Sequence, residues 1–426
     1  MIRPASLSAV CRQCRCNSAT QQAYYERIKT RVKTSESVIE ALVPDSSRFA
    51  RVNQQRQEIH SIDSPYPPLY GVPIGVKDIF HAKGYATKAN AEVPSEELTG
   101  AQGPIISRLR AAGAVILGKT VTAEFAHYDP GPTRNPINYE HTPGGSSSGS
   151  AAAVAAGYCP LSVGTQTIGS IIRPAAFCGI VGFKPSFNRL SNEGIITLSE
   201  SADQTGYFTQ NIESAIFAAE ILFDEWRPIP RIKSPLRIGV PSQAYIQQAD
   251  AVGISHFENH VQTLDSTRHE IVQLDILGNI SQINPRHERL VAAEAALSHH
   301  ELYDQYAGDY SSVLSEMIES GQDVSVAERK QAQVSQRTLR RQITDVMKDN
   351  NLDILVSPAA TGPPPEGIDS TGDPIMNLPW SHAGVPVITF PVSQTDTGLP
   401  LGLQCIAPFG HDEELLRMCE VVADAL

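Results

Sequence analysis

Apolar and polar positions along the chain predict helices and strands that follow one another closely in its first half. Residues 18–58 carry apolar side chains at helical spacing and predict one or two amphipathic surface helices. Residues 69–80 form an apolar run, typical of a buried strand, that a single Lys-Asp pair interrupts. Residues 104–117 predict a helix, with Pro104 in its first turn and Gly113 at its end, and then a strand.

The second half predicts an outer helical layer and a closing strand pair. Residues 285–350 are polar with few Gly or Pro, and we expect helices over 288–306 and 326–348 as a lid or outer layer. Strands are expected at residues 237–240, 352–357, 385–392 and 401–406. The last two should pair antiparallel, and a final helix should begin at Asp412. No linker divides this pattern. It predicts an α/β fold, a single domain with a large mixed, twisted β-sheet covered by helices on both faces.

Composition and charge narrow the classes of partner. The 426 residues are 41% hydrophobic, and the net charge of −12 argues against nucleic acid or an acidic membrane as a partner. No run approaches the ~18 apolar residues of a transmembrane helix. Seven cysteines, an odd number, argue against a disulfide framework and favour a cytoplasmic location. We therefore expect a small-molecule partner, no membrane, and at most a second copy of the chain in a homodimer.

The N-terminal residues read as a helical segment ahead of the main domain. Three arginines and no acid precede Glu26, a composition shared by targeting segments and by the ragged start of a first helix, and we prefer the second reading. The thiols of a Cys-x2-Cys-x-Cys cluster have no further metal ligand nearby in sequence and are expected to be unpaired. The prediction is an N-terminal helical segment at residues 1–58, packed on a domain at residues 59–426.

The most informative stretch, residues 143–174, places two Gly/Ser-rich turns around an uncharged segment. The turns are residues 144–150 and 164–170, and residues 151–156 between them are Ala and Val, which favours a helix buried on all sides. Flexible linkers are polar throughout, so this stretch belongs to the fold. Such turns present backbone N–H groups and hydroxyls that suit an anion or the oxyanion of a reacting carbonyl.

Lys77, Ser146 and Ser170 are the candidates for chemistry. In an apolar strand the amine of Lys77 loses solvation, which favours the neutral form that acts as a base; a strand-end lysine paired with Asp78 is the alternative. Each serine follows a glycine and needs a base to become a nucleophile. His141, the histidine nearest these turns, has no obvious orienting carboxylate. A Ser–Lys arrangement is therefore the more economical assignment.

Several segments resemble the amidase signature family. They are residues 71–80, 118–126, 143–157, 164–185, 357–367 and the two C-terminal strands, so that the resemblance covers roughly residues 60 to 420. It implies that Lys77 is the catalytic lysine, Ser146 the bridging serine and Ser170 the nucleophile that forms an acyl-enzyme. It also implies a cis peptide bond between Gly145 and Ser146. The implied oxyanion hole consists of the backbone amides of Thr167, Ile168, Gly169 and Ser170.

The chain departs from the family pattern beside the proposed nucleophile. Gln166 stands where many members have aspartate, Ile168 where they have glycine, and Arg173 lies one place later than their arginine. Backbone donors survive the change at Ile168, whose side chain would narrow the space beside Ser170. In the family the arginine braces this loop. Because Arg173 is displaced by one residue, its bracing role is the least direct of the roles that the resemblance implies.

Other residues receive roles by their position. Substrate binding is assigned to Gly144, Gly145, Glu124, Tyr128 and Trp380. A structural Glu124 and a core Trp380 are the alternatives. Asp203 resembles a family position that braces the core, and His299, His300 and Glu301 are expected on a solvated helix face. We expect no metal and no cofactor.

The predicted function is a hydrolase acting on C–N bonds in linear amides, which yields a carboxylate and ammonia or an amine. Two alternatives stay open. One is the glutamine-hydrolysing component of a tRNA-dependent amidotransferase, its A subunit, which would need partner subunits. The other is a non-catalytic protein that binds a small anion and has no activated serine. Apolar side chains beside residue 170 hint at an uncharged acyl group next to the scissile bond.

Overall fold

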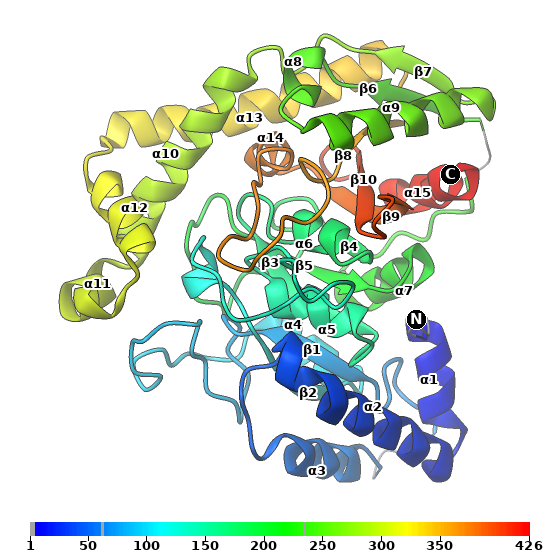
Figure 1. The fold of residues 1–426 in the computed structure, drawn as a ribbon, viewed down its shortest axis with the longest axis vertical. Coiled ribbons are helices and arrows are strands. Elements are labelled where there is room, and N and C mark those ends of the chain that lie inside the picture. Colours follow the sequence, from blue (N-terminus) through cyan, green and yellow to red (C-terminus); the bar gives the residue numbers. More distant parts are fainter. Residues whose placement is uncertain (1–4, 61–63, 233–234) are drawn as a thin grey trace.

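The fold is organised around one ten-stranded sheet (Figure 1). The computed structural model describes residues 5–60, 64–232 and 235–426. Across the sheet the strands lie in the order β2-β1-β3-β5-β4-β9-β10-β8-β6-β7. Their bounds are β1 Pro73–Lys77, β2 Val115–Thr120, β3 Leu161–Gln166, β4 Val181–Lys184, β5 Gln204–Thr209, β6 Arg237–Val240, β7 Glu270–Gln273, β8 Ile354–Pro358, β9 Val387–Gln394 and β10 Pro400–Ile406.

The sheet is mixed, as predicted from the sequence. β1 pairs in parallel with β2 and β3 at one end, and β6 pairs in parallel with β7 and β8 at the other. Antiparallel pairs through β5, β4, β9 and β10 join these two ends. β9 and β10 form the expected antiparallel hairpin, with Pro400 opposite Gln394 and Ile406 opposite Val387.

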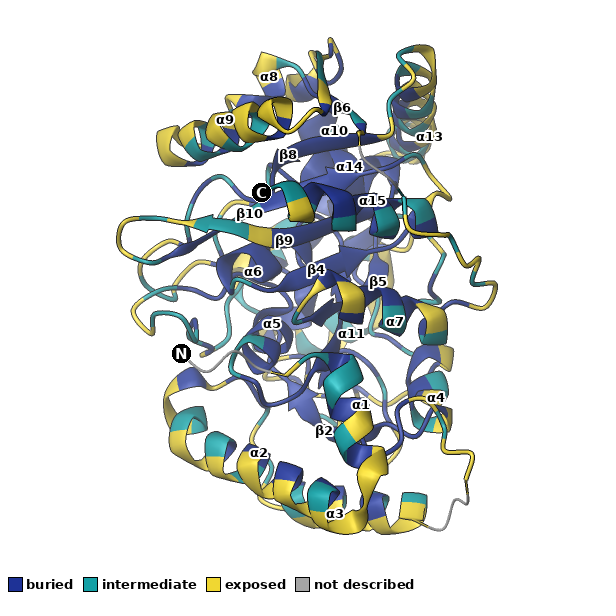
Figure 2. Cartoon of the chain, turned by 90° about the vertical axis from the view of Figure 1, so that its right-hand side faces the viewer, coloured by how far each residue is buried: buried dark blue, intermediate teal, exposed yellow. Residues whose placement is uncertain are grey.

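Helices cover both faces because side chains alternate along each strand (Figure 2). On β5, a Cβ on Gly206 would meet the side chain of Ile171, just before α6 (Ile172–Phe177). The next residue, Tyr207, points the other way and donates its hydroxyl to the carbonyl of Ala215 in α7 (Ile212–Leu222). α5 (Ser148–Ala155) contacts α6, and α15 (Asp412–Ala425) contacts α7. The predicted single α/β domain is thus confirmed.

The N-terminal helices lie at the β2 end of the sheet (Figure 1). The Cys14 thiol donates to the carbonyl of Gly71 and ties the first of them to the segment that leads into β1. The division at residue 58 stays a prediction, and α3 continues past it to His60. The remaining helices are α1 Leu7–Cys16, α2 Ser18–Ile39, α3 Arg48–His60, α4 Pro104–Ala111, α8 Gln243–Ile246, α9 Ala251–Ser266, α10 Ile280–Ser298, α11 His300–Tyr306, α12 Ser312–Gln322, α13 Val326–Asp349 and α14 Leu378–Ala383, with short 3-10 helices at Glu124–Ala126 and Ala307–Asp309. No helix in the described ranges is long and apolar enough to cross a membrane.

The outer layer consists of α10 to α13 (Figure 1). The helix expected over residues 288–306 is in fact two helices, α10 and α11, which meet at His299. The prediction of a solvated His299 is wrong: the residue is 2% exposed, and its Nδ1 is hydrogen-bonded to the Tyr310 hydroxyl at 3.0 Å. The ring of His299 also packs edge-on against Phe125, with the ring centroids 4.9 Å apart.

Candidate active site

Lys77 lies at the end of β1, where two other segments meet it. Because β1 and β3 run parallel, their carboxyl ends lie at the same edge of the sheet. The Lys77 amine is hydrogen-bonded to Thr165 Oγ1 at 2.8 Å and to Ser146 Oγ at 2.9 Å. Asp78 forms an ion pair with Lys119 at 2.6 Å, so the alternative of a Lys77–Asp78 pair is wrong.

The environment of Lys77 favours a neutral amine. The side chain is fully buried, and this burial lowers its pKa to about 7, although the charge of Asp203 acts in the opposite direction. Near neutral pH a large share of the amine therefore carries a free lone pair that can accept a proton. The Asp203 carboxylate accepts from Thr167 Oγ1 at 2.6 Å and from two backbone amides, which fits the bracing role expected for it.

The turn that carries Ser146 is held from its carbonyl side. The peptide bond between Gly145 and Ser146 is cis, as expected. Arg173 donates to the carbonyls of Gly145 at 2.8 Å and Gly372 at 2.7 Å and to Thr371 Oγ1 at 2.9 Å. Burial lowers the pKa of Arg173 to about 10, so the guanidinium stays charged at neutral pH. The displaced arginine thus braces this turn.

The loop after β3 is anchored by its carbonyl oxygens. Three successive carbonyls accept hydrogen bonds: Thr167 from His287 Nε2 at 3.2 Å, Ile168 from Ser381 Oγ at 2.6 Å and Gly169 from the backbone N–H of Arg173 at 3.0 Å. A trans peptide unit directs its C=O and its N–H to opposite sides. Anchoring these carbonyls on one side therefore turns the following N–H groups to the other side.

The amides of this loop are free to bind an anion. Among the described residues, the N–H groups from Thr167 to Ser170 have no acceptor. Several unsatisfied donors beside a serine hydroxyl suit the oxyanion of a tetrahedral intermediate. Ile168 has no left-handed φ, so isoleucine occupies this position without backbone strain.

Gln166 and Ser381 close the loop where many family members would have an aspartate at residue 166. Gln166 Oε1 accepts from the backbone N–H groups of Ile171 at 2.8 Å and Ile172 at 2.9 Å. Its Nε2 donates to Ser381 Oγ at 3.0 Å, and the same hydroxyl donates to the loop carbonyl. The amide side chain satisfies donors and an acceptor at once, which a carboxylate could not do.

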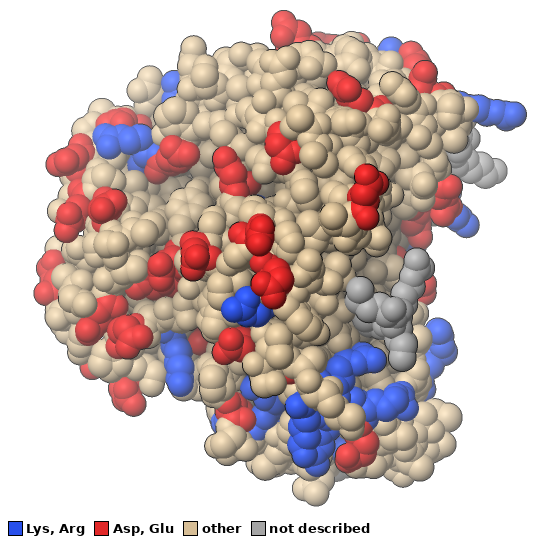
Figure 3. All heavy atoms as spheres, viewed as in Figure 1, with Lys and Arg blue, Asp and Glu red and all other residues tan. Residues whose placement is uncertain are grey.

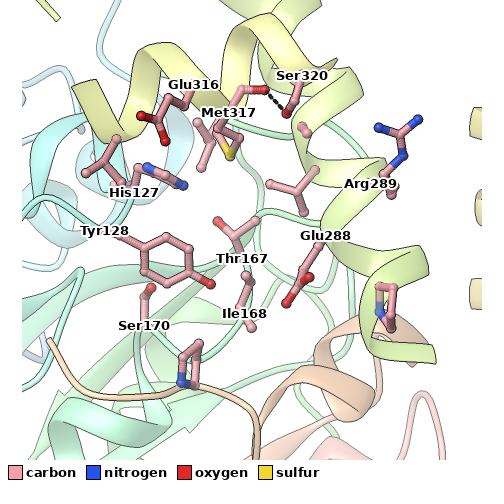
Figure 4. Close-up of a pocket in the computed structure, with 18 of the residues that line it drawn as sticks. His127, Tyr128, Thr167, Ile168, Ser170, Glu288, Arg289, Glu316, Met317 and Ser320 are labelled. Carbon is pink, nitrogen blue, oxygen red and sulfur yellow. Dashed lines mark hydrogen bonds between the residues drawn. The ribbon is translucent and has the colours of Figure 1, made fainter. Parts of the chain in front are cut away.

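A cavity of about 660 Å³ opens beside the loop (Figure 4). Residues 167–170 form one wall, and α10 and α12 contribute the opposite side. Ser170 lines the cavity, whereas Ser146 is buried behind it. In the part of the chain that the structure describes, no hydrogen bond joins Ser146 Oγ to Ser170 Oγ, so the last contact of the expected relay is not made in this conformation.

Of the residues assigned to substrate binding, Tyr128 alone lines the cavity. Gly144 and Gly145 begin the turn that carries Ser146 and do not line the cavity, and a Cβ on Gly145 would meet the Thr371 side chain. Their small size serves close packing of that turn rather than contact with the cavity.

The positions of Trp380 and Glu124 correct their assignment to the substrate site. Trp380 is fully buried outside the cavity and donates from Nε1 to the Tyr245 hydroxyl at 2.8 Å, as a core residue does. Glu124 is buried too, and it accepts from the backbone N–H of Ser311 at 3.0 Å, just before α12. Glu124 therefore joins the segment before residues 126–128 of the cavity to the start of α12, and Trp380 belongs to the core.

A pair of buried histidines supports the loop and was missed in the sequence. His287 Nδ1 and His382 Nδ1 lie 3.1 Å apart, and burial lowers their pKa values to about 4 and about 2, so both rings are neutral. Because His287 uses its Nε2 proton for the Thr167 carbonyl, its Nδ1 must accept from His382. His382 Nε2 then accepts from Ser335 Oγ at 3.1 Å. The two histidines come from different helices, so no spacing in the sequence marks them.

Comparison with known proteins agrees with this geometry. The chain belongs to the amidase family, whose model matches residues 19–416. It is 28% identical to the A subunit of the glutamyl-tRNA(Gln) amidotransferase from Synechococcus sp. (strain WH7803), over 93% of this chain and 92% of that protein. A crystal structure of an amidase superposes with a TM-score of 0.88 at 28% identity, over 97% of this chain and 98% of that one.

A second solved structure comes from work on a vestigial protein complex and the evolutionary origins of an s-triazine catabolic enzyme. It superposes with a TM-score of 0.87 at 26% identity and covers 99% of this chain and 98% of that one. Family membership makes this protein a hydrolase of the class that acts on carbon–nitrogen bonds.

Proposed function

We propose that the protein hydrolyses a linear carboxylic amide through an acyl-enzyme on Ser170. The observation that carries the proposal is the 2.9 Å hydrogen bond between Lys77 Nζ and Ser146 Oγ, made by an amine whose pKa burial lowers to about 7. This amine lies behind a cavity-lining serine whose loop offers unpartnered amides.

The proposed mechanism moves one proton along a relay. Neutral Lys77 takes the proton of Ser146, which takes the proton of Ser170 as Ser170 Oγ attacks the amide carbonyl carbon. The loop amides hold the negative oxygen of the tetrahedral intermediate. The C–N bond breaks as the relay returns a proton to the leaving nitrogen, and water then hydrolyses the ester. Catalytic hydrogen bonds often tighten only when substrate binds, so Ser146 and Ser170 need to approach only then.

Active-site labelling tests this proposal. A fluorophosphonate should label the wild-type protein at Ser170, and Ser170→Ala should lose both the label and ammonia release from a panel of amides. Ser320→Ala is the matched control, because this serine lines the same cavity but its hydroxyl donates to the Met317 carbonyl and has no base beside it. Labelling that survives Ser170→Ala would refute the assignment, and a protein that is never labelled would favour the anion-binding alternative.

The second candidate is the glutamine-hydrolysing component of a tRNA-dependent amidotransferase. It is favoured by the names of curated relatives that match over most of the chain. L-glutamine hydrolysis that requires a co-purifying partner would support this candidate, and hydrolysis of simple amides by the isolated chain would support the first.

A further inference from the structure

We propose that the cavity selects amides whose far end carries a positive charge, such as a primary ammonium group. This inference takes the position of the scissile bond beside Ser170 from the proposed function. The charge preference itself follows from the groups on the opposite side of the cavity.

Two carboxylates face the cavity without a counter-ion. Glu288 on α10 and Glu316 on α12 both line it, and Figure 4 shows their side chains directed toward its interior. Among the described residues neither forms an ion pair or accepts a hydrogen bond. Glu288 keeps contact with solvent, and its partial burial, followed by the nearby charge of Asp373, raises its pKa.

Both arginines that line the cavity are fixed by other partners. Arg173 makes three hydrogen bonds that fix the turn before Ser146. Arg289 binds Glu328 through two hydrogen bonds, at 3.0 and 3.3 Å. Arg289 is thus offset by a carboxylate, whereas the acceptors of Arg173 are neutral and its charge remains. Among the described residues of the lining, the two glutamates therefore outnumber the one unpaired cation. Figure 3 shows the same sign over the surrounding surface, where acidic side chains gather on the face that carries α11 and α12.

A buried ring nitrogen supplies a second, independent sign of a ligand. His127 is 8% exposed and lines the cavity, and its Nδ1 is buried with no hydrogen-bond partner in the described chain. Burial lowers its pKa to about 4, so the ring is neutral and one of its nitrogens is an acceptor. Figure 4 shows this ring between Tyr128 and Glu316. An ammonium group brings the donors that such an acceptor and the carboxylates require.

The rest of the lining suits an aliphatic chain between the two ends. Apolar side chains cover the space between the loop and the carboxylates: Ile168, Leu198, Val291, Ala292, Val313 and Met317. An amide with an uncharged chain and a terminal cation places each part against a matching surface. A terminal carboxylate would face Glu288 and Glu316 and would be repelled.

Three amides of equal length test the charge preference. γ-Aminobutyramide ends in an ammonium group, pentanamide in a methyl group and glutaramate in a carboxylate. We expect kcat/KM for γ-aminobutyramide to exceed that for pentanamide by about tenfold at low salt, with glutaramate the poorest, since each solvent-exposed carboxylate contributes up to about fivefold. Added salt should shrink the ratio.

Charge-neutralising variants locate the effect. We compare kcat/KM for γ-aminobutyramide with kcat/KM for pentanamide. Glu288→Gln and Glu316→Gln should each reduce the logarithm of this ratio by about half. Glu319→Gln is the matched control, because this glutamate lies on α12 but accepts from the Tyr303 hydroxyl outside the cavity. A wild-type ratio of one, or a ratio that falls as far in Glu319→Gln, would overturn the proposal.

Binding separates this inference from the proposed function. Calorimetry on Ser170→Ala measures the affinity for γ-aminobutyramide and pentanamide without any need for hydrolysis. The same titration is possible with the wild type if it hydrolyses neither amide. Tighter binding of γ-aminobutyramide in that case would support the charge preference and reject the proposed reaction. Equal binding of the two amides, or no binding of either, would reject the charge preference.

Discussion

Two buried lysines, Lys77 and Lys184, look alike by every measure except their partners. Both side chains are fully buried, and burial lowers the pKa of each to about 7. Lys77 faces two hydroxyls, those of Ser146 and Thr165. Lys184, at the end of β4, faces the side-chain oxygen of Gln204 at 2.7 Å and a backbone carbonyl at 2.6 Å, which only accept.

This difference shows that a lowered pKa does not by itself make a base. A neutral amine accepts a proton only from a group that has one to give, and a hydroxyl does whereas a carbonyl or amide oxygen does not. Gln204 cannot turn its nitrogen toward Lys184, because Nε2 already donates to two backbone carbonyls. We therefore expect Lys77 to serve the reaction and Lys184 to serve the fold.

The largest expected effect is on the rate after Lys77→Met. Loss of the general base should lower kcat for amide hydrolysis by about 10²–10⁴-fold. The melting temperature near neutral pH should not fall, because the variant no longer buries an amine and the hydroxyls left behind can rotate to other partners. Ammonia release and thermal unfolding measure the two quantities. A Lys77→Met protein that keeps its rate would remove the distinction between the two lysines.

A second difference is that Lys77 adjoins the anchored loop, and this difference can be tested at His287. His287→Phe should free the Thr167 carbonyl and let the following backbone N–H turn away from the oxyanion. We expect kcat to fall about tenfold and KM to stay unchanged. This fall is smaller than the ~10²–10³-fold cost of losing an oxyanion donor outright. His287→Gln, which can still donate, should recover part of the rate. His269→Phe is the control, because this buried ring accepts from the Leu236 amide far from the loop. A fall in KM alone would contradict the positioning role.

The surroundings of Lys77 could be predicted from the sequence, because they are built from short contiguous segments. The strand at residues 69–80 and the turns at residues 144–150 and 164–170 are contiguous patterns of apolar residues, glycine and serine. Each pattern by itself indicates a strand or a turn. Parallel strands have their carboxyl ends at the same edge of the sheet, so these patterns are enough to place Lys77, Ser146 and Ser170 near one another. Their catalytic roles stay a proposal.

The cavity could not be predicted in this way, because its walls come from segments far apart in the chain. Glu288 and Glu316 lie on helices of ordinary polar composition, and nothing in their spacing shows that α10 and α12 face the loop. Trp380 illustrates the converse error, since a large aromatic near the site is fixed in the core by Tyr245. Long-range packing decides these positions, and sequence periodicity does not report it.

The expected effect of Lys184→Met is on stability alone. It leaves two buried acceptors without donors, at a cost of about 1–3 kcal/mol each in the free energy of unfolding, with kcat within about twofold of wild type. Chemical denaturation and the amide assay measure both. A loss of rate comparable to that of Lys77→Met would contradict the division of roles.

The pH dependence of stability sharpens the same test. Between about pH 7 and pH 10.5 the folded protein binds fewer protons at both lysines than the unfolded chain does, so the free energy of unfolding rises with pH through this window. Each methionine variant should remove one lysine's share of the rise. The rate profile has an acidic limb, the fall of kcat/KM toward low pH. Only Lys77→Met should also remove this limb.

The smallest expected effect is a shift of that acidic limb in Thr165→Val. In the wild type, kcat/KM should fall about tenfold per pH unit below about pH 7, where Lys77 becomes protonated. The Thr165 hydroxyl accepts from the amine and so stabilises the charged form; its loss should move the limb to lower pH by up to about one unit. Thr389→Val removes an equally buried strand hydroxyl, one that donates to the Leu403 carbonyl, and should leave the limb in place. An equal shift in both variants would mean that the limb does not report the amine of Lys77.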